Sequence, residues 1–171
     1  MITIRHEQPS DIEQIRNVND LAFKQPSESG IVDKIRDSCQ NILSLVALSE
    51  DKIVGHILFS PAKIGTPDGE IEGMGLAPLA VQPDFQNQGI GSMLAQEGIK
   101  IVKETECPFL IVLGHEKYYP RFGFKPASQF GLKCQWEGVP DGAFMAMIFD
   151  KVQMNNVSGI VRYRDEFNEA M

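Results

Sequence analysis

The sequence predicts a single domain of the α+β class, and three observations lead to this prediction. Strand-like segments follow one another over residues 43–81, a strand–helix–strand unit ends at residue 113, and another apolar strand covers residues 144–149. The chain has 171 residues, of which 43% are hydrophobic and 23% are charged, as in ordinary globular domains. We therefore assign residues 1–150 to the domain and residues 151–171 to a C-terminal extension.

The N-terminal segment predicts one strand and two helices. Apolar and polar residues alternate from Ile2 to Arg5, as in a half-buried strand. The run Pro9-Ser10-Asp11 predicts a helix start with Ser10 or Asp11 as its cap, and apolar residues then recur at helical spacing up to Ala22. We expect a second helix over residues 31–38.

Three antiparallel strands are expected next. They cover residues 43–48, 53–60 and 72–81, and turn-forming residues separate them at 49–52 and 65–69. Short connections of this kind join neighbouring antiparallel strands.

The following segment changes its hydrophobic period. From Gly89, apolar residues recur at helical spacing as far as Glu104, which predicts an amphipathic helix. Residues 109–113 form a continuous apolar run, typical of a buried parallel strand. A short helical turn is expected at residues 116–121, and residues 144–149 are expected to form the last strand.

Charge and cysteine content exclude several kinds of function. The net charge is −7, and no cluster of Lys or Arg offers a surface for nucleic acid. No apolar stretch approaches the ~20 residues of a membrane span, and the N-terminus does not resemble a signal peptide. Cys39, Cys107 and Cys134 are scattered, so we expect free thiols in a reducing cytoplasm and no metal site.

Two glycines at the start of the predicted helix indicate an anion site. The first amides of a helix lack intrahelical acceptors, and the helix dipole adds positive potential there. Gly89 and Gly91 have no Cβ, so a phosphate could approach the backbone closely. The dinucleotide fingerprint fits poorly because Leu94 stands where that motif has its third glycine or alanine, and no Gly-Lys-Ser/Thr loop is present. Alone, such glycines are also compatible with a structural turn.

The same segment resembles the GNAT superfamily of N-acetyltransferases. Gln86-Asn87-Gln88-Gly89-Ile90-Gly91 is similar to its [Arg/Gln]-x-x-Gly-x-[Gly/Ala] motif, and Leu79-Ala80-Val81-Gln82-Pro83 resembles the preceding fourth strand. The resemblance implies that amides from Gln88 to Ser92 bind the pyrophosphate of coenzyme A, and that the strand backbone pairs with its pantetheine arm. The implied cofactor-binding residues are Leu79, Ala80, Val81, Gln86, Asn87, Gln88, Gly89, Ile90, Gly91 and Ser92.

The resemblance also implies a particular fold. GNAT proteins form a three-layer α/β/α sandwich around a mixed sheet whose fourth and fifth strands splay apart at a bulge. Pro78 interrupts the expected fourth strand, and proline is tolerated in sheets mainly at edges and bulges. It is therefore compatible with the splayed slot, and a simple edge strand is the alternative.

A tyrosine motif supplies the catalytic candidate. Tyr119 precedes Gly123 and Phe124 with the spacing of the family's Tyr-x-x-x-Gly-Phe motif, in which the tyrosine often acts as general acid. The wider run resembles an uncharacterised GNAT branch with a Gly-His-x-x-Tyr-Tyr-x-Arg-Phe-Gly-Phe signature. A phenol is protonated at neutral pH and can donate to a leaving thiolate. Tyr118 is the alternative acid, and packing is the alternative role for both tyrosines.

Two positions depart from the family's pattern, and the general base stays open. Val112 stands where many members carry a cofactor-contacting Asn, and Gly75 corresponds roughly to a glutamate of some histone-modifying members. The alternatives for deprotonating the amine are Glu70, Glu72, Glu116, His115 or water. His56 is interpreted as structural.

The sequence thus predicts an N-acetyltransferase that uses acetyl-CoA and a primary amine, on a small molecule or a protein. Transfer would occur by direct attack within a ternary complex, with Val81 offering its amide to the oxyanion. A non-catalytic acyl-CoA sensor or interaction module is one alternative, and a nucleotide-binding protein is another. The acceptor is not indicated, and a homodimer is one of the open oligomeric states.

Overall fold

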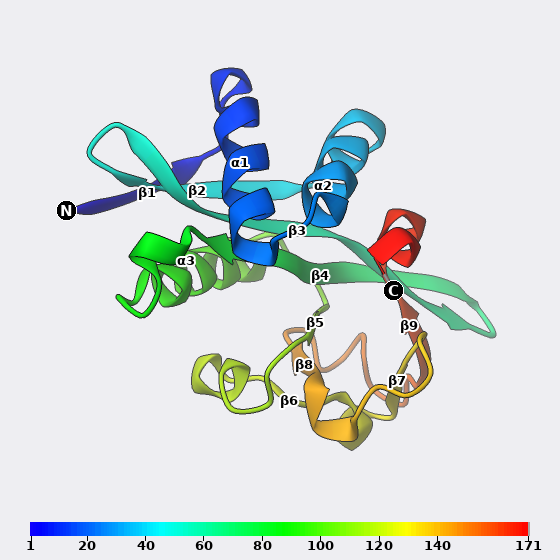
Figure 1. Ribbon diagram of the computed structural model, residues 1–171. Coiled ribbons are helices and arrows are strands. Elements are labelled where there is room, and N and C mark those ends of the chain that lie inside the picture. The colour runs from blue at the N-terminus through cyan, green and yellow to red at the C-terminus, as the bar shows by residue number, and fades with distance from the viewer. Residues whose placement is uncertain (171) are drawn as a thin grey trace. The chain divides into compact units, whose positions relative to one another are not determined.

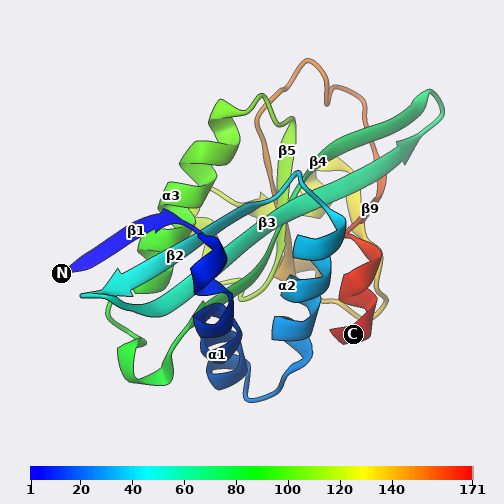
Figure 2. The same cartoon turned by 90° about the horizontal axis from the view of Figure 1, so that it is seen from above.

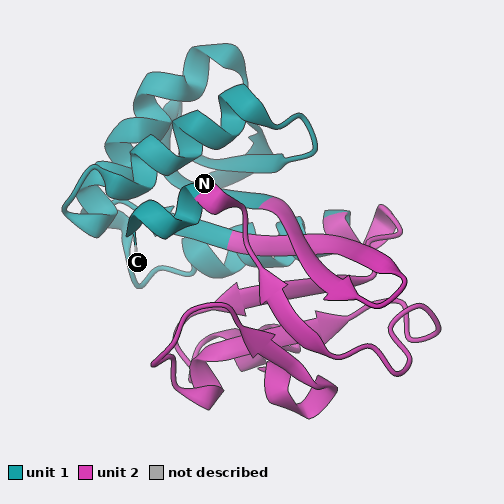
Figure 3. Ribbon diagram, turned by 90° about the vertical axis from the view of Figure 1, so that its right-hand side faces the viewer, with its two compact units in different colours: residues 1–59, 77–101, 166–171 teal, residues 60–76, 102–165 magenta. Residues whose placement is uncertain are grey.

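A computed structural model describes residues 1–170 of the chain. The chain divides into two compact units (Figure 3). Unit 1 consists of Met1–Phe59, Ala77–Ile101 and Glu166–Met171, and unit 2 consists of Ser60–Leu76 and Val102–Asp165.

Unit 1 contains the N-terminal strands and two neighbouring helices. Strand β1 (Ile2–His6) pairs antiparallel with β2 (Leu43–Ser49), and β2 pairs antiparallel with β3 (Lys52–Thr66). Helices α1 (Ile12–Phe23) and α2 (Ser27–Ser38) lie side by side in both Figure 1 and Figure 2. The predicted hairpin and both helices are confirmed, although α2 begins four residues earlier than expected.

Helices cover both faces of β3 within unit 1. On one face, His56 lies against Asn19 of α1. On the other face lies α3 (Ile90–Glu104), where a Cβ on Gly98 would collide with the ring of Phe59. Since side chains alternate along a strand, residues 56 and 59 necessarily point to opposite faces. Unit 1 therefore has a helix–sheet–helix arrangement, with its core on both sides of β3.

The start of α1 differs in detail from the prediction. A short helical turn, η1 (Pro9–Asp11), precedes α1, and the Asp11 carboxylate accepts a hydrogen bond of 2.7 Å from the backbone amide of Gln8. Asp11 also forms an ion pair of 2.6 Å with Arg5. Asp11 therefore occupies the N-cap position of α1, as predicted, but its carboxylate accepts from the Gln8 amide before the helix instead of from an amide of α1.

Unit 2 contains the parallel pair of the mixed sheet. Strand β4 (Gly69–Val81) begins in this unit and pairs in parallel with β5 (Phe109–Leu113). Antiparallel β8 (Phe144–Ile148) follows β5, and the short β6 (Lys125–Pro126) pairs with β8. The parallel β5 strand was predicted from its apolar run and is confirmed, because both of its edges carry strands.

A strand that the sequence analysis missed lies near the C-terminus. Strand β9 (Gly159–Arg162) pairs antiparallel with β3 and in parallel with β7 (Leu132–Cys134). The expectation that residues 144–149 form the last strand was therefore wrong. Strand β9 has four residues, two of them exposed, and so short a segment carries no clear alternation.

Strand β3 also runs further than predicted. It was expected to end at Ser60, and Pro61, the next residue, cannot donate a ladder hydrogen bond. The ladder with β2 ends at Phe59, and the ladder with β9 begins at Lys63. Pro61 lies between the two ladders, where this edge needs no amide donor.

The remaining helical segments are short 3-10 helices. They are η2 (Pro83–Phe85), η3 (Tyr119–Phe122), η4 (Ala127–Phe130), η5 (Asp141–Ala143) and η6 (Asp165–Ala170). Among residues 1–170, no helix combines the length and the apolar character needed to cross a membrane.

Candidate functional site

The glycine-containing loop of unit 1 connects the end of β4 to α3. Its first residue, Gln82, is buried, and its backbone amide donates to the carbonyl of Val54 on β3 at 2.8 Å. Asn87 and Gly89 both adopt positive φ, at 63° and 86°. Two left-handed residues so close together turn the chain sharply into the helix, and glycine tolerates that conformation without steric cost.

Helix α3 begins directly after this turn. Its first backbone hydrogen bond runs from the Met93 amide to the Gly89 carbonyl at 3.0 Å. The amides of Ile90 and Gly91 precede that bond, so they have no acceptor within the helix. A Cβ placed on Gly89 would meet no atom within 4 Å, so the space in front of the turn is open. Open space, unpaired helical amides and the positive end of the dipole suit a phosphate group.

The glutamines of the loop make contacts that the motif alone does not indicate. Gln86 donates from its side-chain amide to the Val81 carbonyl at 3.0 Å, and Gln88 donates to the Asp84 carbonyl at 3.3 Å. Both side chains thus fasten the loop to itself. The backbone of the loop, rather than these side chains, is left to face a ligand.

The predicted cofactor-binding residues of unit 1 form one continuous path. Leu79, Ala80 and Val81 end strand β4, and Gln86 to Gly89 are exposed in the loop that follows. Ala80 is buried, whereas its two neighbours are half-buried. The structure therefore brings these residues together in the order that the sequence predicts.

The catalytic candidate, Tyr119, lies in unit 2 at the start of η3. It is 8% exposed, and its ring packs edge-on against Phe124 with centroids 5.8 Å apart. Burial, followed by the neighbouring Tyr118, raises the pKa of its phenol above the usual value. Tyr119 therefore keeps its proton at neutral pH, as a general acid requires.

The two adjacent tyrosines have different surroundings. Tyr118 is half-buried, and the guanidinium of Arg121 lies 4.4 Å from its ring centroid. Arg121 also donates to the Tyr118 carbonyl at 2.9 Å. Tyr118 is thus part of a cation–π contact near the surface, while Tyr119 points into the unit. This difference favours Tyr119 as the acid.

Gly114 creates the space that the Tyr119 ring occupies. It follows β5 directly, and a Cβ at this position would collide with the ring of Tyr119. Its amide donates to the Ala143 carbonyl at 2.9 Å, which fixes the backbone there. The glycine of the Gly-His-x-x-Tyr-Tyr signature therefore has a physical reason, which is close approach of the tyrosine ring to the main chain.

The four side chains considered as general bases are all exposed. Glu70 and Glu72 lie on the outer part of β4, and His115 and Glu116 follow β5. Glu72 lies 4.0 Å from Lys63, a distance typical of a weak surface pair. Gly75 leaves room for the ring of Tyr163, with which a Cβ would collide. The ring of Tyr163 thus fills the space that a side chain at position 75 would need.

Several further residues have structural roles. Val112 is fully paired within β5, opposite Met145 of β8. Trp136 stacks on Tyr163 with centroids 5.7 Å apart. The three cysteines are free and half-buried. Within residues 1–170, no group of three His, Cys, Asp or Glu residues is arranged to hold a metal ion.

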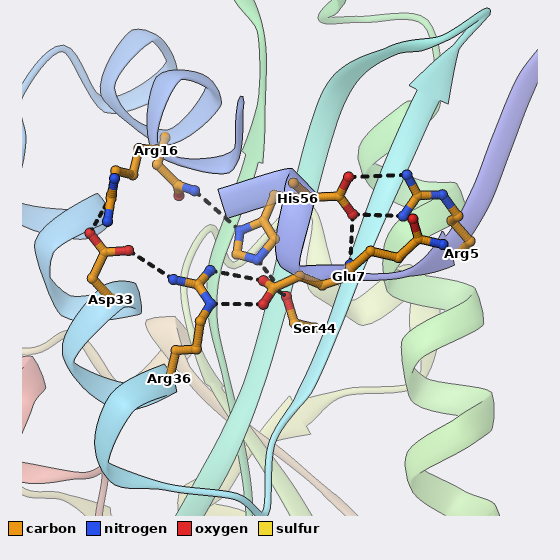
Figure 4. Close-up of polar contacts among 10 residues, drawn as sticks. Arg5, Glu7, Arg16, Asp33, Arg36, Ser44 and His56 are labelled. Atoms are coloured by element: carbon orange, nitrogen blue, oxygen red, sulfur yellow. Dashed lines mark hydrogen bonds and ion pairs between the residues drawn. The ribbon is translucent and has the colours of Figure 1, made fainter. Parts of the chain in front are cut away.

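Unit 1 contains a buried polar network that the sequence analysis did not anticipate (Figure 4). Arg36 of α2 binds both carboxylate oxygens of Glu7, at 2.7 and 2.8 Å. Ser44 donates to Glu7 at 2.7 Å and lies 2.9 Å from Nε2 of His56. The interpretation of His56 as a structural residue fits this position. The partners come from distant segments, so no local pattern in the sequence reveals them.

The tautomer of His56 follows from its partners. Asn19 donates from Nδ2 to the Ile15 carbonyl at 3.0 Å and to His56 Nδ1 at 3.1 Å. Nδ1 therefore accepts, and the single proton of the neutral ring is on Nε2, directed at Ser44. Burial lowers the pKa of His56 from 6.5 to about 4, so the ring is neutral at physiological pH.

The mixed sheet, the glycine turn before α3 and the buried tyrosine after β5 together define an acyltransferase of the acyl-CoA N-acyltransferase fold. The chain belongs to the GNAT family, because the sequence profile described as "Acetyltransferase (GNAT) domain" matches residues 3–127. The family, the fold class and the enzyme class predicted from the motifs are therefore confirmed.

Relatives agree with this membership over almost the whole chain. The uncharacterized N-acetyltransferase YhbS of Escherichia coli (strain K12) is 31% identical over 166 residues, which are 96% of this chain and 98% of the relative. The crystal structure of YhbS from Escherichia coli in complex with CoA has a TM-score of 0.88, at 31% identity, and the match covers 98% of this chain and 92% of that one. A GNAT family acetyltransferase from Brucella melitensis in complex with acetyl-CoA has a TM-score of 0.80, at 32% identity and 98% coverage of both chains.

Proposed function

We propose that this protein transfers an acetyl group from acetyl-CoA to a primary amine, by direct attack within a ternary complex. The observation that carries the proposal is the turn at Gly89, which presents the first amides of α3 to open space. The similar structures from Escherichia coli and Brucella melitensis contain CoA and acetyl-CoA, and this supports the same cosubstrate here.

The cofactor is proposed to bind along the path from β4 to α3. The backbone of Leu79 to Val81 would pair with the amides and carbonyls of pantetheine, as a strand pairs with an added strand. The amides from Gln88 to Ser92 would bind the pyrophosphate, whose charge the helix dipole stabilises. The side chains of Gln86 and Gln88 contribute by holding the loop in shape.

Tyr119 is proposed as the general acid of the reaction. The amine nitrogen attacks the thioester carbonyl carbon, and the resulting oxyanion receives a hydrogen bond from the Val81 amide. The carbon–sulfur bond then breaks, and the phenol of Tyr119 gives its proton to the departing thiolate sulfur. Its raised pKa keeps that proton available at neutral pH.

Water is proposed to accept the proton from the attacking amine. Glu70, Glu72, Glu116 and His115 are the alternative bases, and all four are exposed to solvent. Water has direct access to the amine side of such an open surface and can accept the proton without a dedicated side chain. With water as the base, we expect the amine substrate to be partly unprotonated at neutral pH.

A cytoplasmic location of the protein stays a prediction from the sequence.

An acetylation assay tests the proposal. The wild-type protein would be incubated with acetyl-CoA and a panel of polyamines, amino acids and peptides, and the released thiol would be measured. Tyr119→Phe should lower kcat on the order of a hundredfold, because general acids typically contribute 10²- to 10⁴-fold, while acetyl-CoA affinity stays unchanged. Tyr118→Phe is the matched control and should retain kcat. If no amine releases thiol although acetyl-CoA binds, the non-catalytic sensor replaces this proposal.

A further inference from the structure

A tyrosine from the C-terminal part of unit 2 is buried beside the parallel strands. Tyr163 follows β9 and is 4% exposed. Its backbone amide donates to Oε1 of Gln135 at 2.6 Å, and its ring stacks on Trp136. These contacts hold the side chain in one orientation, toward β4.

The ring of Tyr163 lies directly against the backbone of β4. A Cβ on Gly75 would collide with this ring, so the strand carries no side chain at the point of contact. An aromatic side chain of this size adjoins a strand so closely only where a glycine faces it. Gly75 and Tyr163 are therefore matched in shape.

The hydroxyl of Tyr163 lies where the parallel ladder ends. It donates to the carbonyl of Leu76 at 3.3 Å, and its own oxygen accepts a hydrogen bond from the backbone amide of Leu113, which partly offsets the rise in the pKa of Tyr163 that burial causes. Among the residues that the structure describes, the ladder of β4 with β5 has three pairs and ends at Leu76 and Val112. The hydroxyl thus connects a carbonyl of β4 to an amide of β5 one step beyond the last pair.

Ladder geometry shows what this hydroxyl replaces. In a parallel pair, a residue of one strand bonds the two residues that flank its partner. Gly75 is the partner of Ile111, so the next step would place Leu113 opposite Ala77 and send its amide to the Leu76 carbonyl. The hydroxyl of Tyr163 lies between the Leu113 amide and the Leu76 carbonyl, in place of a direct hydrogen bond between them. The other bond of the step would need an amide on Pro78, which proline does not have.

We infer that Tyr163 is a positioning residue that separates β4 from β5 by inserting its hydroxyl into the next hydrogen bond of the ladder. The inference rests on the proposed function, in which the backbone of residues 79–81 binds the pantetheine arm. The separation of the strands keeps that backbone available to the arm. Without the hydroxyl, the Leu113 amide could bond the Leu76 carbonyl directly, and the ladder would gain a step. The two strands would then lie closer together just before residues 79–81, which would narrow the gap that the cofactor arm is proposed to enter.

Tyr163→Phe tests the inference, because it keeps the ring against Gly75 and removes the hydroxyl alone. Calorimetry would compare acetyl-CoA with adenosine 3′-phosphate 5′-diphosphate, which carries the pyrophosphate without pantetheine. Acetyl-CoA affinity should fall about tenfold, the usual effect of one altered hydrogen-bonding group, while affinity for the nucleotide stays unchanged. A merely structural role would weaken both ligands together.

Trp136→Phe is the matched control, since it alters packing on the same ring and leaves the hydroxyl in place. It should leave the ratio of the two affinities as in the wild type. Hydrogen exchange gives a second readout on the free protein, in which the Leu113 amide should change its protection in Tyr163→Phe and not in Trp136→Phe.

The outcomes separate this inference from the proposed function. If the wild type binds neither ligand, the proposed function fails. If the wild type binds acetyl-CoA and Tyr163→Phe binds it equally well, the inference is overturned while the proposed function stands. Should Tyr163→Phe fail to fold, Gly75→Ala displaces the same ring with the hydroxyl retained. It should show the same selective loss of acetyl-CoA affinity, and an unchanged ratio would overturn the inference.

Discussion

His56 Nδ1 lies 3.1 Å from the side-chain nitrogen of Asn19, in a fully buried part of unit 1. Because Asn19 donates, the ring must be neutral to keep this hydrogen bond. Its opposite nitrogen faces Ser44, which in turn donates to Glu7. The neutral ring thus joins α1 to the strands of unit 1, and its protonation would break that connection.

This relationship predicts that unit 1 loses stability in mild acid. The unfolded imidazole takes up a proton near pH 6.5, whereas burial lowers the folded pKa to about 4. The stabilising contribution is therefore complete above pH 6.5 and declines as the pH falls toward 4, by about 3 kcal/mol in total. Urea unfolding between pH 7.5 and 4.5 would measure this decline. His56→Gln should flatten the curve in that window, and the exposed His6→Gln should not. Equal slopes in all three proteins would contradict the interpretation.

The helix–strand contact of α3 predicts opposite results for two helical glycines. Gly98→Ala would place a methyl group on the ring of Phe59, so we expect a loss of about 1–3 kcal/mol despite the better helix propensity of alanine. Gly30→Ala in α2 has open space around its Cβ and should be neutral or stabilising by up to about 1 kcal/mol. Chemical denaturation measures both. A stabilising Gly98→Ala would show that α3 packs less tightly on Phe59 than described.

Two ion pairs of equal length should differ in strength because they differ in burial. Arg36 and Glu7 are 2.7 Å apart with side chains 15% and 14% exposed, whereas Lys34 and Glu169 are 2.7 Å apart and more than half exposed. Arg36→Met leaves a largely buried carboxylate without its main partner and should cost about 2 kcal/mol. Lys34→Met should cost less than about 1 kcal/mol. Urea melts at pH 7 would compare them, and similar losses would show that burial does not govern these pairs.

The contact between Gly114 and Tyr119 predicts a variant with a lower kcat and an unchanged affinity for acetyl-CoA. Gly114→Ala would push the ring of Tyr119 out of its position, so kcat should fall on the order of a hundredfold if Tyr119 is the acid. Acetyl-CoA affinity should stay within about twofold of the wild type, since the proposed cofactor-binding residues 79–92 lie elsewhere in the chain. Gly65→Ala, which meets no atom within 4 Å, is the control and should leave kcat unchanged. An unaltered kcat in Gly114→Ala would remove the main support for Tyr119.

Much of the fold could be predicted because its signals are local. The apolar period of α3, the uninterrupted apolar run of β5 and the turn at 49–52 each depend on neighbouring residues, and each is confirmed. Strand β9 was missed because it has four residues and gains its order by pairing with β3 and β7. The continuation of β3 past Pro61 depends on a change of partner strand, which no local pattern records.

The same distinction applies to the candidate site. The glycine turn and the tyrosine motif are contiguous, so the sequence indicates them and their order. The contacts of Gly114 with Tyr119 and of Gly75 with Tyr163 join residues that are 5 and 88 positions apart. The Tyr163 hydroxyl at the end of the ladder depends on the longer of these contacts. Its position also depends on the register of β4 and β5, which no local pattern in the sequence records.

The most direct measurement is a calorimetric titration of the purified protein with acetyl-CoA, with ATP and NAD as controls. We expect a dissociation constant on the order of micromolar for acetyl-CoA and much weaker binding of both controls. Gly89→Asp would place a carboxylate at the turn and should weaken acetyl-CoA at least about tenfold, whereas Gly138→Asp, at another exposed glycine with positive φ, should not. Binding of ATP or NAD without acetyl-CoA, or equal affinity in both variants, would contradict the proposed cofactor site at the Gly89 turn.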